Sequence, residues 1–180
     1  MLIFENLRLK IQGKWESLGK VNQVLVAFAG IFIVSLSVTS YLFARQAYDM
    51  RNIKCLAMNV YHEARGEPTK GQYAVAVVTM NRVESDRYPQ DVCQVVYQKA
   101  WIERSKRFVA AFSWTVDQVE DIPLESAAWK ESYQIAQEVY GQAVPSKVQD
   151  ALFYHADHVK PRWAANKLRI AKIGRHIFYK

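Results

Sequence analysis

The order of apolar and polar positions separates one long uncharged stretch from a region of shorter elements. Residues 21–44, VNQVLVAFAGIFIVSLSVTSYLFA, include no charged side chain. As a helix that rises 1.5 Å per residue, this stretch is about 36 Å long, enough to cross a hydrocarbon layer of about 30 Å. The pattern predicts a transmembrane helix over residues 21–44, preceded by a segment at residues 1–20. A short polar connector at residues 45–52 either continues the helix or links it to the next element.

Cations around the apolar stretch indicate its orientation. Arg8, Lys10, Lys14 and Lys20 precede it, and Arg45 and Arg51 follow it. Because cations are enriched on the cytoplasmic side, this excess places residues 1–20 in the cytoplasm and residues 53–180 on the outer, periplasmic side of the cytoplasmic (inner) membrane. A cleavable signal peptide is the alternative. The apolar stretch is longer than a signal core and no A-x-A cleavage site follows it, which favours a single-pass, uncleaved anchor.

Beyond the connector, apolar positions recur at i, i+3, i+4 and i+7, the stripe of an amphipathic helix. This stripe begins at Ile53 and runs to Ala64, and Gly66 and Pro68 end it. Further helices are predicted at residues 69–83, through CQVVYQ (93–98), and from Pro123 to Tyr140 with Gly141 as the stop, whereas residues 105–122 are expected to be irregular.

The C-terminal part has the pattern of strands. Residues 151–156 (ALFYHA) and 173–180 (IGRHIFYK) are rich in aromatic residues, and a loop that contains proline separates them, so they are expected to pair as a small antiparallel ribbon. Side chains alternate along a strand, which puts Phe153 and His155 on one face and Tyr154 on the other; the pattern leaves open which face lines a cleft. The fold class is therefore α+β, mainly helical with a small antiparallel sheet.

Composition and charge narrow the class of partner. The chain has 180 residues, of which 51% are hydrophobic and 23% charged, so a packed core is expected. Residues 1–50 hold five Lys or Arg and three Asp or Glu, which leaves +5 of the net charge of +7 on residues 51–180. A basic domain favours polyanions such as nucleic acid, acidic lipid or the anionic bacterial wall. No arginine-rich arm, zinc-finger spacing or RNA-binding signature is present, so no nucleic-acid partner is expected.

The cysteines and histidines bear on metal binding. Cys55 and Cys93 do not belong to a CxxC pair and cannot supply four ligands for structural zinc. They form either one disulfide outside the cytoplasm or two buried thiols. In the stretch VYHEARGEP, His62 and Glu63 begin like the zinc-protease motif H-E-x-x-H, but Gly66 stands where the second histidine is needed. No metal and no other cofactor is therefore expected.

Glu63 is the candidate for acid chemistry. It lies at the edge of the apolar stripe, where partial desolvation raises the pKa of a carboxyl group. A carboxylic acid that keeps its proton near neutral pH can protonate a glycosidic oxygen as it leaves. The alternative is a glutamate at a helix boundary, paired with Arg65 or a lysine. Glu67 and Asp117 are candidate second carboxylates, because a two-carboxylate glycosidase needs a partner at a defined distance.

Several blocks resemble, in the same order, the spore-cortex-lytic, SleB-like family of cell wall hydrolases. They are NVYHEARGEPTKGQYAVAVVTMNRV (59–83), YPQDVCQVVYQ (88–98), FSWTVD (112–117), ALFYHAD with PRW (151–163) and IGRHIFYK (173–180), and together they cover residues 53–180. The resemblance implies a lysozyme-like fold with a cleft between helices and a small sheet. It also implies cleavage of the peptidoglycan glycan strand between N-acetylmuramic acid and N-acetylglucosamine, with Glu63 as general acid.

The same resemblance implies a second step and a set of cleft residues. After acting as acid, Glu63 would serve as base on the muramic C6 hydroxyl, which gives the anhydro product of a lytic transglycosylase and needs no second carboxylate. The implied substrate-binding residues are Phe112, Ser113, Tyr154, His155, His176, Phe178 and Tyr179. Instead of binding substrate, the aromatic side chains of the strands could pack the sheet against the helices. Trp163 is expected to anchor the core. Relatives carry a further cysteine pair around F-S-W that is absent here, so Cys55 with Cys93 would be the only bridge.

The predicted function is a membrane-anchored enzyme that cleaves peptidoglycan glycan strands, as a lytic transglycosylase or a muramidase. It would act as a phage lysin or as a wall-remodelling hydrolase, and its partners would be the glycan strands and, through residues 21–44, the cytoplasmic membrane. One alternative is a non-catalytic, membrane-anchored wall-binding scaffold on the same fold, and another is a tethered metallopeptidase. No G-x-S-x-G elbow or phosphate loop supports nucleophilic or phosphoryl chemistry.

Overall fold

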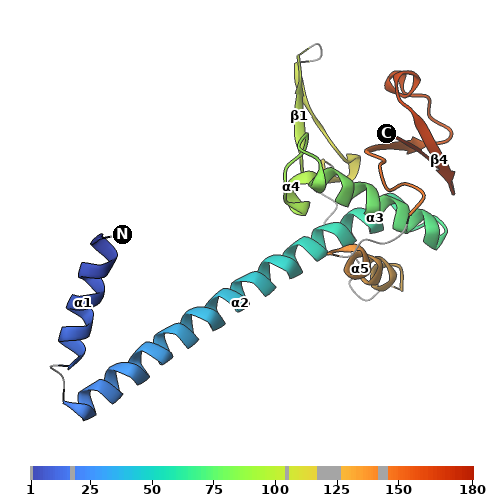
Figure 1. The fold of residues 1–180 in the computed structure, drawn as a ribbon. Coiled ribbons are helices and arrows are strands. Elements are labelled where there is room, and N and C mark those ends of the chain that lie inside the picture. Colours follow the sequence, from blue (N-terminus) through green and yellow to red (C-terminus); the bar gives the residue numbers. More distant parts are fainter. Residues whose placement is uncertain (1, 17–18, 104–105, 117–126, 142–145) are drawn as a thin grey trace. The chain divides into compact units, whose positions relative to one another are not determined.

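The computed structural model describes residues 2–16, 19–103, 106–116, 127–141 and 146–180 (Figure 1). The chain divides into two compact units, Met1–Ala47 and Tyr48–Lys180. Asp117, one of the two candidate second carboxylates, lies outside the described residues.

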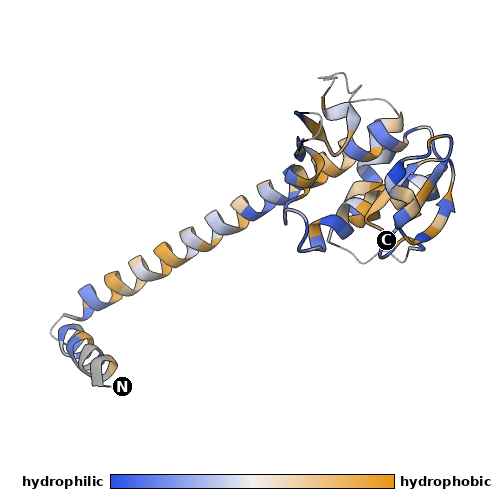
Figure 2. Cartoon of the chain, turned by 90° about the horizontal axis from the view of Figure 1, so that it is seen from above, coloured by the Kyte–Doolittle hydropathy of each residue, from blue (hydrophilic) through white to orange (hydrophobic). Residues whose placement is uncertain are grey.

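The first unit contains α1 (Leu2–Glu16) and the first part of α2 (Lys20–Ala64). Within α2, an 18-residue window reaches a mean hydropathy of 2.1, and none of this window is buried (Figure 2). Among the described residues, α2 is the one helix that is long and apolar enough to cross a membrane, judged by length and composition. The predicted apolar helix over residues 21–44 lies within it.

The connector at residues 45–52 is helical, because α2 continues through it to Ala64. Residues 45–64 contain neither glycine nor proline, so no residue in this stretch breaks the helix before Gly66. The last turns of α2 therefore enter the second unit as one of its core helices.

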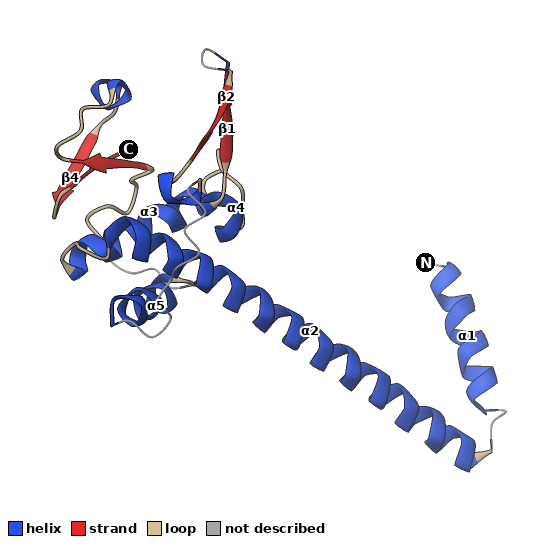
Figure 3. Ribbon diagram, turned by 180° about the vertical axis from the view of Figure 1, so that it is seen from behind, coloured by secondary structure: helices blue, strands red, loops and turns tan. Residues whose placement is uncertain are grey.

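The second unit is built around α3 (Thr69–Glu84), which contacts α4 (Val92–Val96), α5 (Ala127–Val139) and a strand of the C-terminal sheet (Figure 3). The apolar stripe of α2 packs into the same core, where Leu56 and Val60 are fully buried. The helices predicted at residues 69–83 and 93–98 are confirmed as α3 and α4. The helix predicted from Pro123 to Tyr140 is confirmed in its described part, which is α5.

A hairpin is formed by β1 (Lys99–Ile102) and β2 (Arg107–Ala110), which pair antiparallel. The expectation of an irregular segment over residues 105–122 is wrong for β2. Four residues are too short to show a strand period, and pairing with β1 is what defines this strand. Trp101 and Phe108 face each other across the hairpin with ring centroids 5.0 Å apart, and both side chains are exposed.

The C-terminal sheet has three antiparallel strands in the order β3 (Phe153–Ala156), β5 (His176–Tyr179) and β4 (Arg169–Ile173). The predicted pairing of β3 with β5 is confirmed. β4 lies in the segment expected to be a loop, and an irregularity near its start disturbs the period-2 alternation that marks a strand in sequence. Phe178 of β5 is fully buried and joins the sheet to the helical core. The α+β class, mainly helical with small antiparallel sheets, is confirmed.

Candidate active site

Glu63 lies on the last turn of α2 and is half-buried, while its helix neighbours Val60 and Ala64 are in the core. The hydroxyl of Tyr154 on β3 donates a hydrogen bond to Oε2 of Glu63 at 3.1 Å. Arg65, the expected partner in the alternative reading of this glutamate, instead places its guanidinium over a tyrosine ring. No lysine or arginine among the described residues forms an ion pair with Glu63. The carboxyl group is therefore held by a neutral donor.

The surroundings of Glu63 favour its protonated form. Burial raises its pKa above the ordinary value, against smaller lowering effects from the Tyr154 hydroxyl and the charge of Arg82. Arg82 is itself buried, and its Nε donates to the backbone carbonyl of Leu152 at 2.9 Å. Burial and the nearby carboxyl group also raise the pKa of Tyr154 well above its ordinary value, so Tyr154 remains a donor. Glu63 thus keeps its proton to higher pH than an exposed glutamate does, as a general acid must.

Three rings form an aromatic ridge, made of His62, which precedes Glu63 on α2, together with Trp114 and Tyr97. The rings of His62 and Trp114 stack with centroids 4.4 Å and planes 15° apart, and Tyr97 meets Trp114 edge-on at 5.7 Å. Nε1 of Trp114 donates to Oδ1 of Asn59 at 3.1 Å, which fixes the indole. Burial, and then the charge of Arg65, lower the pKa of His62, so its ring is neutral near pH 7. The ridge therefore consists of uncharged aromatic rings, one of which belongs to the residue that directly precedes Glu63 on α2.

Phe112 and Ser113 directly precede Trp114 in the sequence but differ in exposure. Phe112 is buried beneath the guanidinium of Arg82, which lies 5.2 Å from its ring centroid. It therefore helps to position Arg82 rather than offering a surface to a ligand. Ser113 is exposed at the start of the short helix η2 (Ser113–Thr115). Trp114 was not among the site residues predicted from the sequence, although it directly follows Phe112 and Ser113.

The C-terminal sheet divides the predicted strand residues between its two faces. Tyr154 and His176 lie on the inner face, with ring centroids 5.2 Å apart. His155 and Tyr179 lie on the outer face, where Nε2 of His155 and the hydroxyl of Tyr179 are 2.9 Å apart. The predicted alternation of Tyr154 and His155 is confirmed, and the inner face is the one that carries the contact to Glu63.

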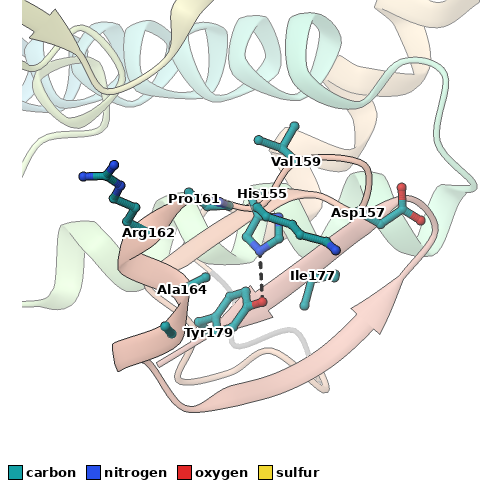
Figure 4. Close-up of a pocket in the computed structure, with 10 residues that line it drawn as sticks. His155, Asp157, Val159, Pro161, Arg162, Ala164, Ile177 and Tyr179 are labelled. Carbon is teal, nitrogen blue, oxygen red and sulfur yellow. Dashed lines mark hydrogen bonds between the residues drawn. The ribbon is translucent and has the colours of Figure 1, made fainter.

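The outer face of the sheet carries an open pocket of about 490 Å³ (Figure 4). His155 and Tyr179 line it, and the ring of Trp163 lies 5.5 Å from each of them. The expectation that Trp163 anchors the core is wrong, because its side chain is 37% exposed and packs on this outer face. Phe178 takes the core position instead.

Glu67 ties the turn between β4 and β5 to the end of α2. Its Oε2 accepts a hydrogen bond from the backbone N–H of Arg175 at 2.8 Å, and its Oε1 accepts from Nε of Arg175 at 2.6 Å. Gly174 adopts φ 58°, and a Cβ there would collide with Oε2. Burial alone would raise the pKa of Glu67, but the Arg175 hydrogen bonds and the charges of His176 and Arg175 bring it below the ordinary value. Both oxygens are engaged, which argues against Glu67 as a second catalytic carboxylate.

We expect Glu67→Gln to lower the free energy of unfolding by about 1–3 kcal/mol near neutral pH, because it removes a charge-assisted contact to a buried carboxylate. Since the pKa of Glu67 is lowered in the folded state, its contribution is present above the unfolded pKa and is lost as pH falls through the folded pKa. The difference from wild type should therefore shrink in acid. Urea unfolding at several pH values measures it.

Asp150→Asn is the matched control for Glu67→Gln, because it breaks the exposed pair of Asp150 with Lys180. Exposed pairs contribute little, so a smaller loss is expected. Equal losses in the two variants, or a loss in Glu67→Gln that does not change with pH, would contradict the assignment.

Cys55 of α2 and Cys93 of α4 form a disulfide with their Cα atoms 5.2 Å apart. It joins the helix that carries Glu63 to the helix that precedes Tyr97 of the aromatic ridge. Among the described residues, no group of three or more His, Cys, Asp or Glu side chains is placed to hold a metal ion.

Residues 66–179 match the family model described as Cell Wall Hydrolase. Similar curated proteins include the spore cortex-lytic enzyme of Oceanobacillus iheyensis, 33% identical over 140 residues, and that of Bacillus subtilis, 30% identical over 136 residues. These matches cover 75% and 73% of this chain but only 44% and 38% of the relatives, so the chain spans less than half of their length.

Two solved structures have a similar fold. The catalytic domain of the Bacillus cereus SleB protein is 32% identical with a TM-score of 0.53, and the match covers 73% of this chain and 91% of that one. The catalytic domain of the germination-specific lytic transglycosylase SleB from Bacillus anthracis is 33% identical with a TM-score of 0.55, and the match covers 72% of this chain and 93% of that one.

Proposed function

Since the chain belongs to the cell wall hydrolase family, we propose that it cleaves the glycan strands of peptidoglycan and that Glu63 is its general acid. The observation that carries this proposal is the setting of Glu63. It is a half-buried carboxyl group with a raised pKa, held by the Tyr154 hydroxyl, without an ion-pair partner among the described residues. This combination is unusual for a structural glutamate and is what protonation of a leaving oxygen requires.

In the proposed mechanism, the two oxygens of Glu63 have different roles. Tyr154 donates to Oε2, which leaves Oε1 to carry the proton that passes to the glycosidic oxygen between N-acetylmuramic acid and N-acetylglucosamine. As that bond breaks, Glu63 becomes a carboxylate. It then takes the proton of the muramic C6 hydroxyl, whose oxygen attacks C1 and forms the anhydro ring. This route needs no second carboxylate, in keeping with the engagement of Glu67 by Arg175.

The aromatic ridge supplies the surface for the sugar rings. The C–H groups on a pyranose face carry partial positive charge and are attracted to the negative face of an aromatic ring. Tyr97 is 43% exposed and sits at one end of the ridge, while His62 adjoins the acid. The exposed hydroxyl of Ser113 adds a hydrogen-bonding group beside Trp114.

We further propose that residues 21–44 anchor the chain in the cytoplasmic membrane with residues 1–20 inside and the cleaving domain outside. The unburied apolar window of α2 supports the anchor, and the excess of cations before it supports this orientation. The Cys55–Cys93 disulfide suits an oxidising compartment. Both a phage lysin and a cellular wall-remodelling enzyme fit this placement.

Protease added to intact spheroplasts should digest residues 53–180 and spare a tag at the N-terminus; digestion of the tag would reverse the orientation.

Digestion of purified sacculi by the full chain, followed by mass spectrometry of the products, tests the cleavage. Anhydromuramic ends are expected and identify a lytic transglycosylase, whereas reducing muramic ends would identify a muramidase. Freed peptides with intact glycan would instead indicate a peptidase. Binding to sacculi without any released product would favour the non-catalytic scaffold.

We expect Tyr154→Phe to move the alkaline limb of the pH–activity profile to higher pH. The hydroxyl stabilises the ionised form of Glu63 and lowers its pKa, so its removal lets burial raise that pKa further. An acid with a higher pKa stays protonated further up the pH scale. Rates of sacculus clearing across a pH series measure the limb, and Tyr133→Phe, which removes the hydroxyl of a tyrosine on α5 that contacts Trp129, is the control. A limb that stays in place or moves to lower pH would contradict the assigned hydrogen bond.

A further inference from the structure

The outer pocket of the C-terminal sheet is separate from the proposed cleavage reaction. Its volume of about 490 Å³ lies within the range of small-ligand sites, about 300–1,000 Å³. His155 on β3 and Tyr179 on β5 line it, and residues 157–165 form one wall (Figure 4). Tyr154 and His155 are consecutive on β3, so Glu63 and the pocket lie on opposite sides of one strand.

The floor of the outer pocket is polar. Nδ1 of His155 lies 2.8 Å from the carbonyl oxygen of Ala156, which only accepts, so Nδ1 is assigned a proton. In the tautomer with the proton on Nδ1, Nε2 accepts the hydrogen bond of the Tyr179 hydroxyl. The Tyr179 oxygen keeps a lone pair for a donor on a ligand, and Ile177 and Ala164 add apolar surface. Such a floor suits an amide N–H and a small aliphatic group.

The rim of the outer pocket is cationic. Lys160 and Arg162 line it, and neither forms an ion pair with another described residue. The acid in the lining, Asp157, lies 2.7 Å from Nζ of Lys172, so its charge is already balanced. A carboxylate is the group that an arginine and a lysine at such a rim bind best, because the guanidinium can donate to both of its oxygens.

We propose that the outer pocket binds the acidic stem peptide that branches from muramic acid, an inference that rests on the proposed cleavage of peptidoglycan. A stem peptide combines backbone amides, methyl-sized side chains and free carboxylates. The amides match the Tyr179 oxygen, and the small side chains match the apolar surface of Ile177 and Ala164. The carboxylates match the two cations of the rim. Because β3 is an edge strand, a peptide attached to a sugar near Glu63 has one strand to pass before it reaches His155. The pocket would then select peptide-bearing strands over bare ones.

The test is calorimetric titration of the full chain carrying Glu63→Gln, in detergent micelles, with a free stem peptide. The same peptide with amidated carboxylates and inorganic phosphate are the comparison probes. We expect Lys160→Ala with Arg162→Ala to raise the Kd for the free-acid peptide about tenfold or more, the effect of losing charge-assisted hydrogen bonds. The matched control is Lys130→Ala with Lys147→Ala, which removes two exposed lysines elsewhere and should leave the Kd unchanged.

Three results would overturn the pocket assignment: equal peptide affinity with and without the two rim cations, equal affinity for the amidated peptide, or phosphate binding as tight as peptide binding. Tyr179→Phe removes only the hydroxyl and should weaken peptide binding several-fold. This variant tests the role of the pocket floor independently of the two cations. The two proposals fail separately. A chain that binds the peptide through Lys160 and Arg162 but releases no glycan fragments refutes the cleavage alone, whereas one that releases fragments without binding the peptide refutes the pocket alone.

Discussion

Replacing Glu63 by glutamine is expected to reduce the release of glycan fragments from sacculi by about 10²–10⁴-fold, the contribution typical of a general acid. Glutamine keeps the size of the side chain and accepts the Tyr154 hydrogen bond through its amide oxygen, but it has no proton to give to a leaving oxygen. Binding to sacculi should persist, because the aromatic ridge and the outer pocket are unchanged. Product release and sedimentation with sacculi, measured on the same samples, separate the two effects.

The control for Glu63→Gln is Glu84→Gln, which makes the same chemical change at an exposed position at the end of α3. It should leave both release and binding unchanged. Undiminished release by Glu63→Gln would remove the basis of the proposed mechanism. A variant that loses binding and thermal stability together would show that Glu63 supports the fold, which is the role expected of a glutamate at a helix boundary.

The sequence predicted the helices better than the strands, for a physical reason. A helix closes its hydrogen bonds within one segment, so the spacing of apolar residues from Ile53 to Ala64 is enough to indicate it. A strand closes its hydrogen bonds with another segment. β1 and β2 are four residues each and are defined by their mutual pairing, so neither shows a period of its own. β3 and β5 are equally short, but their high aromatic content made this strand pair predictable.

The candidate site follows the same division. Glu63 could be singled out from the sequence because its burial follows from its position between apolar residues of the same helix. Its contact with Tyr154 joins positions 91 residues apart and depends on how β3 meets α2, which no local pattern encodes. The alternation of Tyr154 and His155 was predictable, but which of them faces the acid was not. Trp114 was missed because its partners, His62 and Asn59, lie on α2, far away in sequence.

The contacts of the aromatic ridge involve the residue that follows α4 as well as α2, the helix that carries Glu63. Tyr97 follows α4 directly, meets Trp114 edge-on and donates from its hydroxyl to the sulfur of Met58 at 3.6 Å. The position of α4 against α2 therefore sets one end of the aromatic ridge. The disulfide between Cys55 and Cys93 is the covalent link that fixes this position.

Replacing both cysteines by serine is accordingly expected to lower the free energy of unfolding by about 2–4 kcal/mol, because the disulfide closes a loop with a sequence separation of 38 residues and restricts the unfolded chain. Urea unfolding of the full chain in micelles measures the loss. Reductant should bring wild type to the stability of the Cys55→Ser, Cys93→Ser variant and leave that variant unchanged. Sugar binding should weaken with stability, because Tyr97 is no longer held against Trp114. Wild type that is insensitive to reductant, or a serine variant as stable as wild type, would contradict the bridge and remove the redox argument for placing this domain outside the cytoplasm.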